Sequence, residues 1–294
     1  MRFGSGAALA PIALLLGCAA PTLPPAPAPV SSPLPSAEEA YSGAIFVEGA
    51  LEQGGWLRGR VPPGTARLTL GGARVAFDSE GRFFAGIDRD APASLRITGS
   101  AANRQTISRD LLVARREWQI ERVDVPLRGS VPSETFMAIR RPELAAIEAA
   151  RARRSDRAGW LQTFVWPVKG RISGRFGSQR IYQGVPGSYH SGLDIAPGGS
   201  GAPFVAPADG VVVLAAQKPF SLEGNLLIVD NGMGLNSAFL HSSRLAVKQG
   251  DRVRQGQTIG YIGATGRASG PHLHWSLKWQ DARLDPLLFL PPMP

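Results

Sequence analysis

The sequence contains little cysteine and few aromatic and charged residues. Its 294 residues include one cysteine and four histidines, with 7% aromatic and 19% charged residues. A single cysteine excludes an internal disulfide. With 35 glycines and 25 prolines, this composition favours a mostly β protein with many turns and some irregular linker. The length is enough for one large domain or two modest ones.

The chain carries a net charge of +9. An excess of positive charge favours an acidic neighbour, such as nucleic acid, anionic lipid or an anionic cell-wall polymer. No basic cluster alternates with aromatic residues, so nucleic acid is the weakest candidate and we expect no nucleic-acid partner. Because arginine is scattered through nearly every segment, a plain bias in composition explains the charge equally well.

The first eighteen residues have the size and composition of a secretory signal. Arg2 precedes an apolar stretch, Phe3 to Gly17, that is too short to span a bilayer comfortably. The stretch ends in Leu15-Leu16-Gly17-Cys18, which resembles the lipobox of bacterial lipoproteins, where the cysteine is lipidated. We therefore predict a lipoprotein signal peptide over residues 1–18 with lipidation at Cys18. The alternative is an ordinary cleaved signal whose cysteine is incidental.

Residues 19–42 are predicted to form a proline-rich linker. Proline recurs at almost every second position from Pro21 to Pro35, which prevents a packed core and favours extended polyproline II. At roughly 3.1 Å per residue, such a segment would hold the folded part about 45 Å from a membrane. A tail without a spacing role is the alternative. Ala19-Ala20, in place of an acidic residue, resembles the outer-membrane sorting pattern of Gram-negative lipoproteins.

Three further regions follow. Short alternating segments with frequent turns predict an immunoglobulin-like β-sandwich over residues 43–128, in which nothing suggests chemistry. Residues 129–159 are predicted to be a helical linker, with a helix that begins near Pro142 and ends near Arg154. Residues 160–294 again predict β structure punctuated by glycine, with segments 247–253 and 257–263 as a pair of strands.

That glycine-punctuated pattern also suits a lipoyl- or biotinyl-type carrier domain. A carrier needs a lysine at an exposed hairpin tip, and none is evident. The carrier hypothesis also leaves the histidines unexplained, because all four lie in this region: His190, His241, His272 and His274.

The histidines predict a metal site. On a strand, His272 and His274 would face the same side, whereas Leu273 and Trp275 would face the core. Asp194 follows His190 by four residues with Gly192 between them, so a turn could bring both onto one ion. Zinc accepts imidazole nitrogen and carboxylate oxygen, and a catalytic site keeps three protein ligands plus water. Spacing alone does not decide which histidines bind metal.

The motifs His190-x-x-x-Asp194, Phe239-Leu240-His241 and Gly270-Pro271-His272-Leu273-His274 resemble the lysostaphin/LytM-type zinc peptidases of the M23 family, which cut peptidoglycan peptides. The resemblance covers about residues 167–286. It implies an M23 peptidase domain of LytM type, with a sandwich-like β fold, over residues 160–294. It also implies that His190, Asp194 and His274 bind one Zn²⁺ per chain and that His241 and His272 form the catalytic pair.

The resemblance therefore implies a zinc metalloendopeptidase that hydrolyses peptide cross-links of peptidoglycan. With the predicted signal, it would be exported and lipid-anchored in the cell envelope, on the periplasmic face of the outer membrane if the cell is Gram-negative. The rival hypothesis is a non-catalytic LytM-like module that binds or activates a cell-wall amidase. Members with that role typically lack several metal ligands, and this chain lacks none. The bond that is cut, a D-Ala to diamino-acid cross-link or a glycine bridge, is left open.

Two positions depart from the family pattern. Phe239 stands where the family often has tyrosine, and Ser242 stands where it often has leucine. We expect Phe239 to keep the ring and to lose a hydroxyl near the substrate. Neither change touches a predicted ligand.

Overall fold

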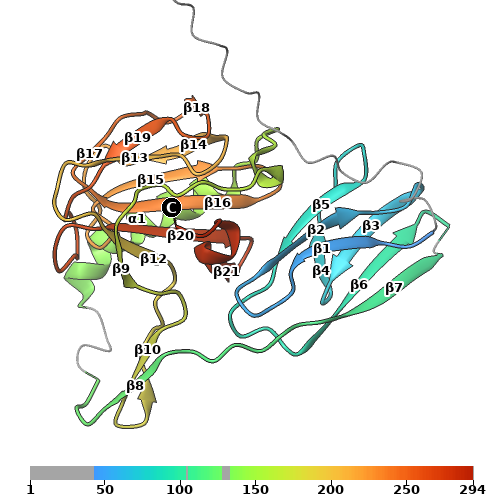
Figure 1. Cartoon of the computed structure of the whole chain (residues 1–294), viewed down its shortest axis with the longest axis horizontal. Coiled ribbons are helices and arrows are strands. Elements are labelled where there is room, and N and C mark those ends of the chain that lie inside the picture. Colours follow the sequence, from blue (N-terminus) through green and yellow to red (C-terminus); the bar gives the residue numbers. More distant parts are fainter. Residues whose placement is uncertain (1–42, 104, 128–132, 294) are drawn as a thin grey trace, which may run out of the picture. The chain divides into compact units, whose positions relative to one another are not determined.

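The computed structural model describes residues 43–103, 105–127 and 133–293 (Figure 1). These residues all belong to one compact unit that spans residues 37–294. The predicted signal peptide, Cys18 and the proline-rich linker lie outside the described residues. In the part of the chain that the structure describes, no helix has the length and apolar character needed to cross a membrane.

The first described region consists of two antiparallel sheets. One sheet has the strand order β1-β2-β5, and the other has the order β4-β3-β6-β7. Alternate residues of both sheets, among them Leu57, Leu68, Phe83 and Ile97, are completely buried. The strands are β1 (Phe46–Ala50), β2 (Trp56–Arg60), β3 (Thr65–Leu70), β4 (Ala73–Val75), β5 (Arg82–Gly86), β6 (Ser94–Ala101) and β7 (Thr106–Leu112). The prediction of a mostly β fold is confirmed, whereas the immunoglobulin-like type of sandwich stays a prediction.

Strand β8 (Ile120–Val123) joins two distant parts of the chain. It pairs in parallel with β10 (Gln179–Tyr182), and β10 pairs antiparallel with β11 (Val185–Pro186). An ion pair strengthens the junction, because Arg180 Nε donates to Glu121 Oε2 at 2.6 Å. The hairpin of β10 and β11 therefore gains a third strand from the segment that follows the first two sheets.

An eight-stranded sheet dominates the second half of the chain. Its order is β18-β14-β15-β16-β20-β12-β9, and β21 pairs with the central strand β20. A smaller sheet has the order β13-β19-β17. The strands are β9 (Arg171–Gly174), β12 (Leu193–Ala196), β13 (Pro203–Val205), β14 (Gly210–Ala215), β15 (Asn225–Asp230), β16 (Leu235–Ser242), β17 (Arg244–Leu245), β18 (Arg252–Val253), β19 (Thr258–Tyr261), β20 (Leu273–Trp279) and β21 (Ala282–Leu284).

Segments 247–253 and 257–263 each contain a strand, as predicted, but the prediction that they form a pair is wrong. The two segments do not pair with each other, since β18 pairs with β14 and β19 pairs with β13 and β17. The amide of Val212 donates to the Asp251 carbonyl and the amide of Gly250 donates to the Val212 carbonyl. These two bonds hold the first segment against the edge of the large sheet, so it cannot form a hairpin with the second.

Strand β20 (Leu273–Trp279) is buried on one face only. Leu273, Trp275 and Leu277 are at most 1% exposed, whereas His274 and the other alternate residues are half-buried. The Trp275 ring stacks between Phe239 and Phe164, at centroid distances of 6.4 and 6.3 Å. The predicted alternation of this strand is confirmed, and the buried aromatic rings set its orientation.

Helix α1 (Glu134–Ala152) covers the opposite face of the sheet. Its Ala150 and Ile147 pack against Ile228 of β15 and Ala238 of β16. The strand register places Ala238 beside Ser276 and Leu240 beside His274. Directly opposed residues of an antiparallel pair point to the same side. The helix therefore lies over the sheet face from which His274 projects.

The helix begins eight residues before the predicted start at Pro142 and ends near the predicted end. Ser133 caps it, since its hydroxyl accepts the amide of Phe136 at 3.1 Å. Pro142 lies in the interior, where its missing N–H leaves one carbonyl without an intrahelical partner. The first turns are retained because Arg140 donates to both carboxylate oxygens of Glu223, at 2.6 Å each.

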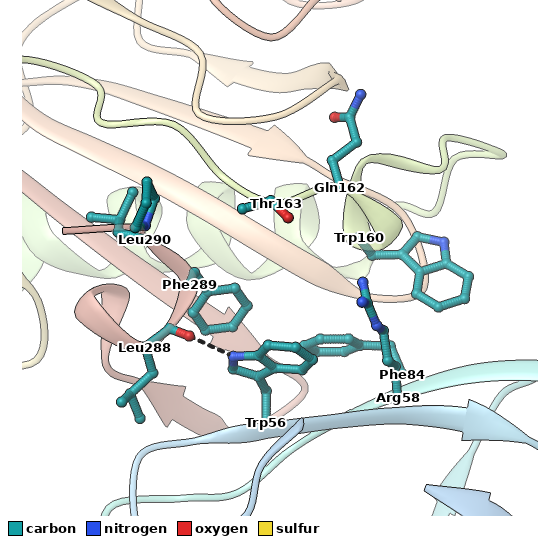
Figure 2. Close-up of a pocket in the computed structure, with 10 residues that line it drawn as sticks. Trp56, Arg58, Phe84, Trp160, Gln162, Thr163, Leu288, Phe289 and Leu290 are labelled. Carbon is teal, nitrogen blue, oxygen red and sulfur yellow. Dashed lines mark hydrogen bonds between the residues drawn. The ribbon is translucent and has the colours of Figure 1, made fainter. Parts of the chain in front are cut away.

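A small hollow of about 240 Å³ separates the first sheet from the carboxyl-terminal segment (Figure 2). Trp56 packs against Phe289, with the ring centroids 5.4 Å apart, and its indole N–H donates to the Leu288 carbonyl at 2.9 Å. Arg58 donates to the Leu161 carbonyl at 2.9 Å and to Glu48 at 2.6 Å. The polar groups of these two residues are therefore already used to join the two regions. The segment includes the 3₁₀ helix η3 (Pro286–Phe289), and Leu161 ends the 3₁₀ helix η2 (Gly159–Leu161).

The ion pair of Arg140 supplies a test of the helix position. In Arg140→Met, Glu223 and Glu143 keep their mostly buried charges without the guanidinium. We expect the free energy of unfolding to fall by about 3 kcal/mol, because breaking a buried pair leaves an uncompensated charge. Urea denaturation measures the change.

Arg141→Met is the matched control on the same helix. Arg141 pairs with Glu134, and both side chains are more than half exposed. Its replacement should change the unfolding free energy by less than about 1 kcal/mol. Equal losses in the two variants would contradict the assigned role of Arg140.

Candidate metal centre and catalytic histidines

His190, Asp194 and His274 form a compact cluster. One ligand atom from each lies within 4.8 Å of the others. Asp194 Oδ1 is 2.8 Å from His274 Nδ1 and 3.1 Å from His190 Nε2, and the two imidazole nitrogens are 3.2 Å apart. The structure thus brings together the three residues predicted as ligands, and their role as ligands stays a prediction.

Strand register and a turn build this cluster. Asp194 on β12 lies directly opposite His274 on β20. His190 comes from the loop before β12, and its amide donates to the Ser178 carbonyl at 2.8 Å. Glycine is needed beside these side chains. A Cβ on Gly174 would meet Asp194 Oδ2, and a Cβ on Gly192 would lie 2.7 Å from His274 Nε2.

His241 and His272 lie next to the cluster. The His241 ring centroid is 5.0 Å from that of His272 and 6.2 Å from that of His274. His272 Nε2 is 3.7 Å from Asp194 Oδ1. His241 adopts φ 63° at the end of β16, a left-handed conformation that is uncommon for a residue with a side chain. In a regular strand the His241 ring would face the same side as Phe239. The local bend turns the ring toward the other histidines instead.

Backbone carbonyls orient three of the four imidazoles. The Nδ1 atoms of His190, His241 and His272 lie 3.0, 2.9 and 2.8 Å from the carbonyls of Arg175, Thr265 and Gly270, respectively. A carbonyl only accepts, so Nδ1 carries the proton and a neutral ring keeps its lone pair on Nε2. The sequence did not predict these three carbonyl partners, because every residue has a main-chain carbonyl and residue types do not show which one accepts a hydrogen bond.

Burial and the neighbouring carboxylate set the protonation of the site. Burial alone would raise the pKa of Asp194, but the hydrogen bonds and charges of His190 and His274 outweigh it and hold that pKa well below its usual range. Burial lowers the pKa of His274 despite its contact with Asp194. Burial also lowers the pKa of His241, although the Thr265 carbonyl offsets part of the effect. Neutral imidazole and ionised carboxylate are the forms that bind metal.

A cleft of about 1370 Å³ opens onto the cluster. His190, Asp194, Tyr189 and Arg267 are among the residues that line it. Gln119 to Glu121, in and beside β8, form part of its wall together with the β10–β11 hairpin. The cleft is large enough for several residues of a peptide.

Phe239 does not reach the cleft. The ring is completely buried and stacks on Phe204 at 5.5 Å as well as on Trp275. The expectation that this position lies near the substrate is therefore wrong. The strand alternates normally up to Leu240 and bends only at His241, so the residue two positions before His241 points into the core.

The donor set of the cluster suits zinc. Two imidazole nitrogens and one carboxylate oxygen are three of the ligands that Zn²⁺ prefers, and a three-residue set leaves a coordination position for water or substrate. The Arg175 carbonyl fixes His190 with Nε2 toward Asp194, as a bound imidazole requires. Among the described residues, this is the group of histidine, cysteine and acidic side chains that converges closely enough to hold an ion.

Comparisons with known proteins agree with this geometry. Residues 188–286 match the model of Peptidase family M23, so the chain contains a Peptidase family M23 domain. The chain is 38% identical over 115 residues to Peptidoglycan DD-endopeptidase ShyA of Vibrio cholerae, an alignment that covers 38% of this chain and 26% of ShyA. It is 31% identical to Murein hydrolase activator NlpD of Escherichia coli over 45% of this chain and 32% of NlpD. It therefore spans less than two thirds of each of these relatives.

One solved structure is similar over most of the chain. It is a crystal structure from Pseudomonas aeruginosa that carries the peptidase M23 name, with a TM-score of 0.62 and 29% identity. The match covers 81% of this chain and 94% of that one. The similarity therefore extends well beyond the M23 domain.

Gly174 offers a test of the cluster that leaves every predicted ligand in place. In Gly174→Ala, the new methyl group would clash with Asp194 Oδ2, and the carboxylate must move. We expect zinc affinity to fall by at least about tenfold, the loss typical when the support of a ligand is disturbed. Competition with a chromogenic chelator measures the affinity. Gly199→Ala, whose Cβ meets open space, is the control and should bind as the parent does.

Variants of His272, just before β20, and of His274, on β20, should differ in zinc content. His274→Ala removes a predicted ligand and should abolish stoichiometric zinc. His272→Ala removes a ring whose Nε2 lies 3.7 Å from Asp194 and should keep close to one equivalent. Elemental analysis of the purified variants decides. If both variants lose zinc equally, the division of roles between the two residues is wrong.

Proposed function

We propose that this protein is a zinc metalloendopeptidase that hydrolyses peptide cross-links of peptidoglycan. The observation that carries the proposal is the geometry of five side chains. His190, Asp194 and His274 converge on one point, and His241 and His272 lie beside them. In this proposal residues 160–294 form the peptidase region, residues 129–159 a helical linker and residues 43–128 an accessory region.

His190 Nε2, Asp194 Oδ1 and His274 Nδ1 would hold the zinc ion. When bound, zinc lowers the pKa of a coordinated water toward about 7 and polarises a carbonyl group. Asp194 keeps its charge because its pKa is low, and the lowered pKa of His274 keeps that imidazole neutral at neutral pH. Asp194 and His274 are thus presented in the forms that bind metal. For His190, burial is outweighed by the hydrogen bond and charge of Asp194, which raise the pKa, so metal binding would release a proton from that ring.

His241 and His272 would move protons and stabilise negative charge on the scissile carbonyl. Each donates Nδ1–H to a main-chain carbonyl, so Nε2 is the atom that acts on the substrate. The His241 ring is neutral at neutral pH because burial lowers its pKa, and it can accept a proton. An imidazolium at either position would donate a hydrogen bond to the developing oxyanion.

Several features support a location in the cell envelope. The predicted signal peptide and Cys18 would export the protein and anchor it to a membrane by lipid. The net charge of +9 suits the anionic polymers of that compartment. The endopeptidase relative from Vibrio cholerae acts, by its name, on peptidoglycan.

The second candidate is a non-catalytic module that activates a cell-wall amidase. The match to Murein hydrolase activator NlpD favours it. The complete cluster of His190, Asp194 and His274, with both neighbouring histidines, favours the enzyme. The presence of zinc separates the two, because an activator has no need of a metal bound by three residues.

A muropeptide assay tests the proposed activity. Soluble protein without residues 1–20, supplied with zinc, should release peptides from purified sacculi, and mass spectrometry of the products should identify the bond that is cut. His190→Ala should reduce release by at least about a hundredfold, since a site without metal loses its main electrostatic stabilisation. No release by the parent protein, combined with stimulation of an added amidase, would support the activator instead.

A further inference from the structure

A second cavity, of about 220 Å³, lies between helix α1 and the face of the large sheet that the helix covers. His274 and Ser191 are part of its lining, so the cavity reaches the predicted metal ligand His274. The rest of its wall contains four cationic side chains and one acidic side chain, namely Arg140, Arg151, Lys278, Arg283 and Glu223. The ion pair between Arg140 on helix α1 and Glu223 uses only two of these five charges.

The charges around this cavity do not balance. Glu223, the one acid, is already occupied by both terminal nitrogens of Arg140. Lys278 contacts only the exposed Asp281, at 3.5 Å. Within the described residues, the Arg151 guanidinium has no hydrogen-bond or ion-pair partner, and its buried Nε is unpaired. The Arg283 guanidinium lies near the neutral Tyr189 ring and has no ion-pair partner in the described ranges of the chain. Arg151, Lys278 and Arg283 therefore lack a close and well-placed counter-charge.

Arg151 is held in an unfavourable place. Burial lowers the pKa of its guanidinium, the positive charge of Arg283 lowers it further, and Glu223 offsets only part of the effect. Arg283, on β21, lies at the rim with its guanidinium 5.4 Å from the Tyr189 ring. Guanidinium groups that point into a shared cavity match the two oxygens of a carboxylate.

The hollow in Figure 2 gives a useful contrast. Its Arg58 is paired with Glu48 and with the Leu161 carbonyl, and its Trp56 indole N–H is bonded to Leu288. That hollow has no cationic group left to attract a ligand, whereas the cavity beneath α1 has three.

We propose that Arg151, Lys278 and Arg283 form an anion subsite that binds a carboxylate of the peptide substrate beside the metal cluster. The proposal rests on the function proposed above. It adds a preference for acidic peptides, because an uncharged amide would leave the same guanidinium groups buried without a counter-charge. The subsite would contribute to substrate binding and would not take part in bond cleavage.

The experiment compares two forms of one peptidoglycan stem-peptide fragment. One form keeps its free carboxylates, and in the other they are converted to amides. Binding is measured by calorimetry in zinc-loaded protein that carries His272→Ala, which prevents turnover. The background protein should bind the acidic form at least about tenfold more tightly, as expected for one charge-assisted hydrogen bond.

Arg151→Met and Arg283→Gln should each remove most of that preference, and Arg141→Met should keep it. Arg141 lies on the same helix but faces solvent, so it is the matched control. Arg283→Gln lies on a different element, which keeps the test decisive if Arg151→Met is unstable. Equal binding of both peptide forms by the background protein, or an unchanged preference in both variants, would overturn the subsite.

Cleavage assays with His272 intact separate this proposal from the proposed activity. If both hold, Arg151→Met should raise KM for the acidic fragment by about tenfold and leave kcat close to the parent value. If the parent cleaves neither fragment but binds the acidic one with the expected preference, the activity fails and the subsite stands. If it cleaves both fragments with equal KM, the activity stands and the subsite fails.

Discussion

The contact between Asp194 and His274 is the constraint on which the rest of the site depends. These residues face each other across adjacent antiparallel strands, and one carboxylate oxygen lies 2.8 Å from the imidazole. A slip of one residue in this register would send His274 into the core and Trp275 into the cleft. The stack of Trp275 between Phe239 and Phe164 opposes that slip. The hydrophobic core thus maintains the geometry of the polar cluster.

Much of this arrangement could be predicted from residue types. Alternation in Leu273-His274-Trp275 predicts which side chains face away from the core, and the mostly β class follows from composition and turns. The convergence of His190 with Asp194 was predictable because only three residues separate them and one of these is Gly192. The assignment of His190, Asp194 and His274 as metal ligands stays a prediction from resemblance to a family, since spacing alone leaves the histidines equivalent.

Other features could not be predicted because they depend on contacts between distant segments. The early start of α1 depends on Arg140 and Glu223, which are far apart in the sequence. The place of Phe239 depends on where strand β16 bends, and only the left-handed conformation of His241 reveals that position. The unpaired charge of Arg151 becomes visible only when the helix lies on the sheet, because on an isolated helix the same residue would be solvated.

The parallel pairing of β8 with β10 means that the region from residue 160 onward is not a self-contained module. Gln119 to Glu121 form part of the cleft wall, although they precede the M23 match by more than sixty residues. A fragment cut from the chain at residue 160 would keep all four histidines and Asp194 but would leave the β10–β11 hairpin with an open edge. Such a fragment would keep the histidine cluster but would lose the part of the cleft wall that Gln119 to Glu121 supply. Shortened versions of this protein therefore have to begin before β8 if they are to keep the cleft of the whole chain.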